Sequence, residues 1–172
     1  MSDPVAYFIS FTCYGSRLHG EVRGSVDLDH NVYGTPILPP NPERFAARRA
    51  ALAHTPYTLT EERPAIVLDG IVALALKRRW TLWAVHVRTE HLHTVVTARG
   101  DDIDRVMTDL KAAGSFRLNR AYPSDQGRKF WTRHGSTRYV WNEAQFAAVA
   151  DYVLNQQGEP MAVYRHPDLG NA

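Results

Sequence analysis

The chain has 172 residues, 44% of them hydrophobic, and a formal net charge of only +2, so we expect one domain, residues 1–172, with a core of its own. Its longest apolar stretch begins at Ala65 and is broken by Asp69, which argues against a membrane span. The N-terminus lacks the basic start and apolar run of a secretory signal. With one cysteine, Cys13, no disulfide can form within the chain, and we expect a cytoplasmic protein.

The first predicted strand covers residues 6–13, where apolar side chains alternate onto one face. Residues 14–60 form a long insertion that contains five of the ten prolines and one short helical pattern at 42–52. A connection of that length in a compact domain is usually functional or mobile. We therefore interpret it as an insertion with a task of its own.

The remaining chain alternates between helical and strand patterns. A helix at 61–80, two strands at 81–87 and 91–98 joined as a hairpin, a helix at 101–121, a strand near 138–141 and a helix at 143–158 are predicted. Without the insertion, this order predicts an α+β protein of the ferredoxin-like (RRM-like) type, an antiparallel sheet with helices on one face, followed by a C-terminal helix.

The second strand of the hairpin carries two histidines, His91 and His93. Residues two apart in a strand point to the same face, close enough to hold one ion between them. Such a pair can also be structural, with one ring bonded to a backbone carbonyl and the other in solvent. The spacing alone leaves both interpretations open.

The last helix carries Tyr152 and Gln156, which are four residues apart and so share one face. A tyrosine at the edge of an apolar stripe is often only an amphipathic side chain with a packed ring and a solvated hydroxyl. The pair becomes informative when it is considered together with the histidines.

These motifs together resemble a known family. His91-Leu92-His93 is similar to the His-hydrophobic-His motif of the HUH endonucleases, and the Tyr152–Gln156 segment, YVLNQ, resembles the Y-x-x-x-Q motif of single-tyrosine, IS200-like transposases of insertion sequences. The segments YGSRLHGEVRGSVD from Tyr14 and HGSTRYVW from His134 resemble the REP-associated tyrosine transposase branch. The resemblance spans about residues 6–160 and departs from the family at Glu90, where Asn or Asp is usual.

The resemblance implies a mechanism and its residues. Tyr152 would be the catalytic nucleophile and would form a covalent 5′-phosphotyrosine with a cut strand of single-stranded or hairpin DNA. His91, His93 and the amide oxygen of Gln156 would hold a divalent metal, Mg²⁺ or Mn²⁺, at the scissile phosphate. The family also includes dimers, so a homodimer is possible, and the tyrosine could act in its own subunit or in its partner.

The charge distribution indicates where DNA would bind. Residues 111–141 contain seven Lys and Arg and one Asp, and this segment of about +6 also holds six aromatic rings suited to base stacking. Of Tyr139 and Trp141 we expect at most one to face outward. The candidate DNA-binding residues are Lys111, Arg117, Arg120, Trp131, Arg133 and Arg138, with Arg17 and Arg23 of the insertion as candidates for hairpin recognition.

A second hypothesis is a non-catalytic, domesticated module that binds hairpin DNA on the same fold. The presence of both histidines, the tyrosine and the glutamine favours the enzyme, because a binding module has no physical need for all four. A replication or conjugation initiator is less favoured, because the chain is short and has no helicase-like extension.

Overall fold

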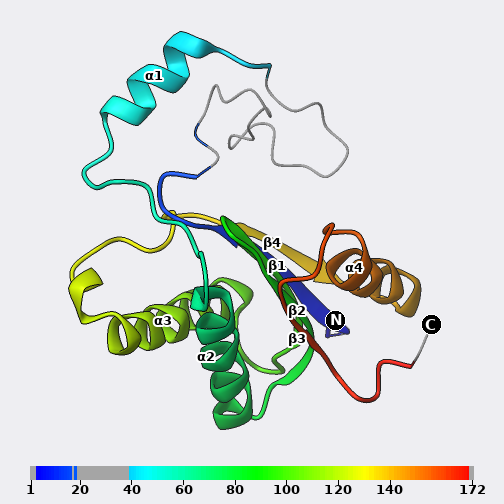
Figure 1. Ribbon diagram of the computed structural model, residues 1–172. Helices are drawn as coiled ribbons and strands as arrows, with labels where there is room; N and C mark the ends of the chain where they lie inside the picture. Colours follow the sequence, from blue (N-terminus) through cyan, green and yellow to red (C-terminus); the bar gives the residue numbers. More distant parts are fainter. Residues whose placement is uncertain (1–2, 17, 19–38, 171–172) are drawn as a thin grey trace.

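The computed structural model describes residues 3–16, 18 and 39–170 of the chain, and its centre is an antiparallel β-sheet of five strands in the order β4-β1-β3-β2-β5 (Figure 1). The strands are β1 (Ala6–Thr12), β2 (Thr81–Val87), β3 (His91–Thr97), β4 (Ser136–Val140) and β5 (Ala162–Arg165). The first four strands have the ferredoxin-like order that the sequence predicts, so the α+β prediction is confirmed.

In the described part of the chain, four α-helices and one short 3-10 helix connect the strands. They are α1 (Pro42–Ala50), α2 (Arg63–Arg78), α3 (Ile103–Ala121), η1 (Pro123–Asp125) and α4 (Glu143–Asn155). Local sequence explains their ends: Pro64 lies in the first turn of α2, where its missing N–H costs nothing. The side chains of Asp102 and Asn142 accept hydrogen bonds from the first backbone N–H groups of α3 and α4.

The helices lie on both sides of the sheet. In Figure 1, α2 and α3 cover one face, and α4 crosses the opposite face. Each face has its own apolar cluster, because successive strand residues point to opposite sides. Ile9, Phe11 and Leu92 are buried on the side of α2 and α3, whereas Val95 packs with Val153 of α4 on the other side.

The last strand, β5, was not predicted. It pairs with β2 and follows Gly158, whose φ of +78° suits glycine. This strand brings the chain back to the sheet after α4 and adds a fifth strand at the edge opposite β4.

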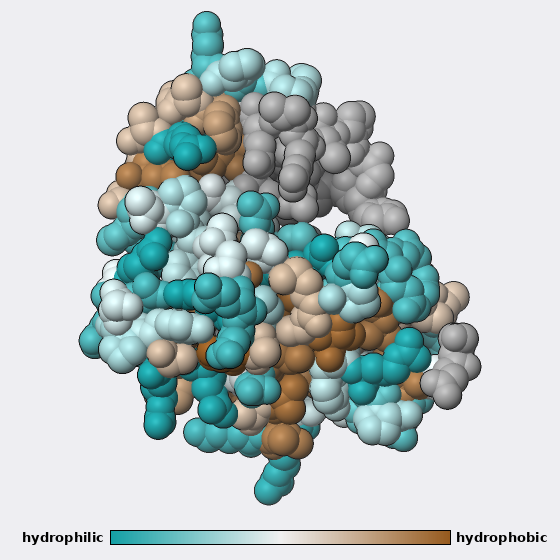
Figure 2. Space-filling view, in the orientation of Figure 1, coloured by the Kyte–Doolittle hydropathy of each residue, from teal (hydrophilic) through white to brown (hydrophobic). Residues whose placement is uncertain are grey.

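The described part of the insertion contains α1, which has no buried residue and lies away from the sheet (Figure 1). Figure 2 shows exposed hydrophobic surface over this helix. The end of the predicted insertion belongs to the core instead, since Tyr57 and Leu59 are at most 2% exposed. Within the described residues, no helix is both long and apolar enough to cross a bilayer.

One cysteine and one aromatic pair show how burial differs between the core and the edge of the sheet. Cys13 is fully buried, and burial raises the pKa of its thiol to about 12, as suits an unreactive core cysteine. The expectation that at most one of Tyr139 and Trp141 faces outward is wrong: they are 42% and 52% exposed and stack on each other. The reason is that β4 is an edge strand and Trp141 lies beyond its end.

Candidate active site and nucleic-acid interface

The two histidines lie side by side on β3, on the face of the sheet that α4 covers. The ring centroids of His91 and His93 are 4.9 Å apart. Ser10 of β1 is the cross-strand partner of His93, and its Oγ lies 2.5 Å from His93 Nδ1. When Nδ1 carries the proton and donates it to this hydroxyl, the lone pair of His93 is on Nε2.

Tyr152 reaches the same place from the last turn of α4. The helix packs its apolar side, Val149 and Val153, onto the sheet, which leaves Tyr152 at the edge of the contact and 38% exposed. Its ring centroid is 5.4 Å from that of His93. Phe8 of β1 packs beside both rings, and its ring centroid is 6.0 Å from that of Tyr152 and 5.9 Å from that of His93. The tyrosine and the histidine pair therefore meet within one chain, although about 60 residues separate them in the sequence.

Gln156 lies just beyond α4 rather than inside it, because the helix ends at Asn155. Its Nε2 donates a 2.5 Å hydrogen bond to Asp151, which also accepts from Asn155, and these two bonds lower the pKa of the Asp151 carboxyl. With Nε2 held by Asp151, Oε1 is the atom that could bind a metal. Among the described residues no group of three or more His, Cys, Asp and Glu could hold a metal ion, so metal binding here depends on the glutamine, and it remains a prediction.

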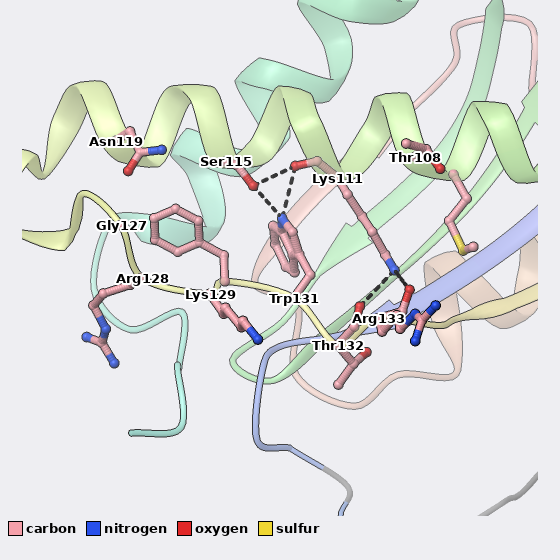
Figure 3. Close-up of a pocket in the computed structure, with 12 residues that line it drawn as sticks. Thr108, Lys111, Ser115, Asn119, Gly127, Arg128, Lys129, Trp131, Thr132 and Arg133 are labelled. Atoms are coloured by element: carbon pink, nitrogen blue, oxygen red, sulfur yellow. Dashed lines mark hydrogen bonds between the residues drawn. The ribbon is translucent and has the colours of Figure 1, made fainter. Parts of the chain in front are cut away.

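The basic segment forms an open groove of about 480 Å³ between α3 and residues 127–133 (Figure 3). Lys111 and Trp131 line it but serve the fold: Lys111 Nζ donates to the carbonyls of residues 132, 133 and 134, and burial lowers the pKa of this amine. Trp131 Nε1 donates to the Lys111 carbonyl and to Ser115 Oγ. Both residues thus hold the groove together, and their contact with DNA remains a prediction.

The exposed cations of the groove are Lys129 and Arg133, and Figure 3 shows the side chains of both within it. The buried Oδ1 of Asn119, also in the groove, has no hydrogen-bond partner in the part of the chain that the structure describes.

The other DNA-binding candidates lie elsewhere. Arg117 and Arg120 line a second groove, between α2 and α3, and the guanidinium of Arg120 lies over the exposed ring of Phe116. Arg138 is the cross-strand partner of Phe8, so it belongs to the face that carries His93 and Tyr152. Arg17 and Arg23 lie outside the described residues, so their predicted role in hairpin recognition is not tested.

Sequence reasoning missed three side chains of the candidate site: Ser10, Phe8 and His86. The period of two in β1 placed Ser10 and Phe8 on one face, but the face they share with the histidines depends on strand pairing over more than 80 residues. His86 is the cross-strand partner of His93 and is 1% exposed. A histidine within the apolar strand 81–87 was the sequence signal that could have indicated a buried polar side chain here.

A family model identifies the chain as a DNA-processing enzyme of the transposase class. The chain belongs to the IS200-like transposase family, which matches residues 58–156 and therefore more than half of the sequence. That match includes the histidine pair, Tyr152 and Gln156.

Comparison with one solved structure agrees on the fold, and a second is similar at a lower score. A REP-associated tyrosine transposase bound to a REP hairpin is similar with a TM-score of 0.52 at 12% identity; the match covers 88% of this chain and 66% of that one. A candidate transposase from Deinococcus radiodurans R1 has 16% identity and a TM-score of 0.47, with 91% and 93% of the two chains covered. No curated protein matches the chain.

Proposed function

We propose that this chain cuts and rejoins single-stranded DNA beside hairpins, through a covalent 5′-phosphotyrosine at Tyr152. The observation that carries the proposal is the contact between the Tyr152 and His93 rings, whose centroids are 5.4 Å apart in a single chain. Membership of the IS200-like transposase family supports the reaction class. The hairpin bound to the similar REP-associated transposase supports hairpin DNA as the substrate.

In the first step, Tyr152 Oη attacks the scissile phosphorus in line with the 3′-oxygen. The Oη–P bond forms as the P–O3′ bond breaks, and the phenol proton ends, in the net reaction, on the released 3′-hydroxyl. A phenol is mostly protonated at neutral pH, so the phosphate must be made more electrophilic or the proton must be removed. Tyr152 is 38% exposed, so a strand on the surface can contact this residue.

His91, His93 and Gln156 Oε1 would hold the divalent metal. His93 fits such an ion, because Ser10 Oγ lies 2.5 Å from its Nδ1, at the place of the outer hydrogen bond that metal-binding histidines commonly make. Two nitrogens and one amide oxygen suit Mg²⁺ or Mn²⁺ better than a closed, thiolate-rich zinc site. When bound, the metal supplies Lewis-acid polarisation of the phosphate oxygens.

The reverse step completes strand transfer. A phosphotyrosine keeps the ester energy of the cut bond, so attack by the 3′-hydroxyl of another strand restores Tyr152 and forms a new phosphodiester without ATP. The half-buried Phe8 and Arg138 lie beside this site, since they are cross-strand partners on the same face, and the charge of Arg138 has the sign that attracts phosphate.

The groove beside α3 would hold the DNA backbone outside the site of cutting. Lys129 and Arg133 are its exposed cations, and Lys111 and Trp131 keep its two walls together. Thr132 joins the groove to the active face, because its hydroxyl lies 3.0 Å from that of Thr12, the cross-strand partner of His91.

The reaction is tested with a labelled pool of hairpin oligonucleotides whose single-stranded flanks are randomised, incubated with the protein and Mn²⁺. We expect a covalent adduct on a denaturing gel that Tyr152→Phe abolishes and EDTA prevents. Tyr164→Phe, on β5, is the matched control and should form the adduct normally. An adduct that survives Tyr152→Phe would place the nucleophile elsewhere, and hairpin binding without any adduct would favour the non-catalytic module.

The DNA groove is tested by charge reversal. Lys129→Glu should weaken hairpin binding and reduce the slope of log affinity against log salt by about 1, as expected for one lost phosphate contact. Lys77→Glu, at the exposed end of α2, is the control with the same change of net charge. Equal effects of the two variants would show that only overall charge matters and that the groove is not the binding surface.

A further inference from the structure

A third histidine, His86, lies buried between the sheet and the end of α4. It is 1% exposed on β2 and is the cross-strand partner of His93. Its Nδ1 lies 3.2 Å from the carbonyl of Val153, and its Nε2 accepts a 3.1 Å hydrogen bond from the backbone N–H of Met161. Because a carbonyl can only accept and a backbone N–H can only donate, His86 is neutral and carries its proton on Nδ1. Burial lowers its pKa and so favours this neutral form.

The Val153 carbonyl belongs to the last turn of α4, where carbonyls have no partner within the helix. His86 therefore supplies a partner for the residue directly after Tyr152. Its other ring nitrogen binds Met161, the residue before β5, so one imidazole joins the helix end to the returning strand.

A second side chain holds the same turn. Arg88, two residues along from His86, donates a 2.8 Å hydrogen bond to the carbonyl of Glu159. The turn between α4 and β5 is thus bound at both Glu159 and Met161 by side chains of β2 and the β2–β3 connection, which leads directly into the histidine pair.

We infer that His86 is a positioning residue for Tyr152: its two hydrogen bonds fix the end of α4 on the sheet so that the phenol stays beside the His91–His93 pair. This inference rests on the proposed function, because it concerns the geometry of that reaction. His86 does not touch the reacting atoms itself. It acts through the Val153 carbonyl and through the turn that closes at Met161.

The experiment compares three variants. His86→Leu removes both hydrogen bonds, and His86→Asn keeps an N–H near the position of Nδ1. Thr94→Val is the matched control, because Thr94 is also fully buried in the sheet and its hydroxyl also donates to a backbone carbonyl, that of Ala84, but it faces α2 and α3. Melting temperature, affinity for uncut hairpin DNA, the single-turnover rate of adduct formation and amide hydrogen exchange are measured for each.

We expect His86→Leu and Thr94→Val to lower the melting temperature alike, whereas only His86→Leu slows adduct formation at saturating DNA, by about tenfold to a hundredfold. DNA affinity should change less than about twofold, and His86→Asn should recover part of the rate. The Met161 and Gln156 amides should exchange faster in His86→Leu than in Thr94→Val.

Equal adduct rates in His86→Leu and Thr94→Val would overturn the inference. If the wild-type chain forms no adduct, the proposed function fails, and the exchange data decide on His86 alone. Unchanged protection of Met161 and Gln156 in His86→Leu would then overturn its positioning role, and selective loss of protection would support it.

Discussion

The hydrogen bond between Ser10 and His93 should control metal affinity. Ser10→Ala removes the hydroxyl that lies 2.5 Å from Nδ1, and the two residues are direct cross-strand partners. Loss of such an outer partner typically weakens metal binding by about 10–100-fold, which is about 1.4–2.7 kcal/mol. The imidazole would then rotate more freely, and its Nε2 would spend less time directed at the ion.

The assay is titration of the apo protein with Mn²⁺, followed by electron paramagnetic resonance of the free ion, together with a melting curve. Ser136→Ala is the control, since Ser136 is the partner of Ser10 on the other side and lies on the same face. We expect weaker binding in Ser10→Ala alone, with a loss of stability of about 1 kcal/mol from one hydrogen bond. If Ser10→Ala and His93→Ala both bind Mn²⁺ as the wild type does, the metal is not held at this pair and the reasoning fails.

Three further predictions concern stability. Asp125→Ala removes the buried acceptor of the Tyr57 hydroxyl, at 3.0 Å, and should cost about 1–3 kcal/mol, seen as a melting temperature lower by about 2–4 °C per kcal/mol; an unchanged value would contradict a structural role. Gly114→Ala would bring a Cβ to 2.9 Å from the Trp131 ring and should lower the free energy of unfolding by about 1–3 kcal/mol in chemical denaturation; an unchanged value would show that the indole moves aside. Burial lowers the pKa of His86 below 6.5 in the folded state, so the unfolded state binds the proton more tightly. The contribution of neutral His86 to the free energy of unfolding is therefore fully present above pH 6.5. This contribution is lost as the pH falls toward the folded-state pKa. His86→Leu should lack this acid-dependent part in urea unfolding at a series of pH values.

The parts of the fold that the sequence predicts are those with a strong local signal. The predicted helices at 61–80 and 101–121 are long periodic patterns, and the structure has α2 at Arg63–Arg78 and α3 at Ile103–Ala121. By contrast, β5 has only four residues, which is too short for a period of two to be distinguished from a loop, and its pairing with β2 stabilises it. The C-terminal strand therefore depends on contacts with residues that are distant in sequence.

In the candidate site too, some features follow from local spacing and others depend on contacts that are distant in sequence. The spacing of His91 and His93 fixed their common face, and Tyr152 lies beside them as the motifs required. The roles of Lys111 and Trp131 could not be predicted from composition, because a basic or aromatic residue looks the same in sequence whether it meets DNA or a backbone carbonyl. Only the path of residues 127–133 beside α3 distinguishes the two cases.

The two faces of the sheet divide the proposed tasks, and β1 connects them. Its alternate residues point to opposite sides, so Phe11 packs against Trp131 at the groove while Ser10 supports His93 on the active face. We expect a strand of DNA held at the groove to pass the end of β1, where Thr12 contacts Thr132, on its way to the tyrosine. The cations along this route therefore affect DNA affinity, whereas Ser10 affects the metal ligands. Charge reversal in the groove should change DNA affinity. Loss of the Ser10 hydroxyl should change metal affinity and leave DNA binding unchanged.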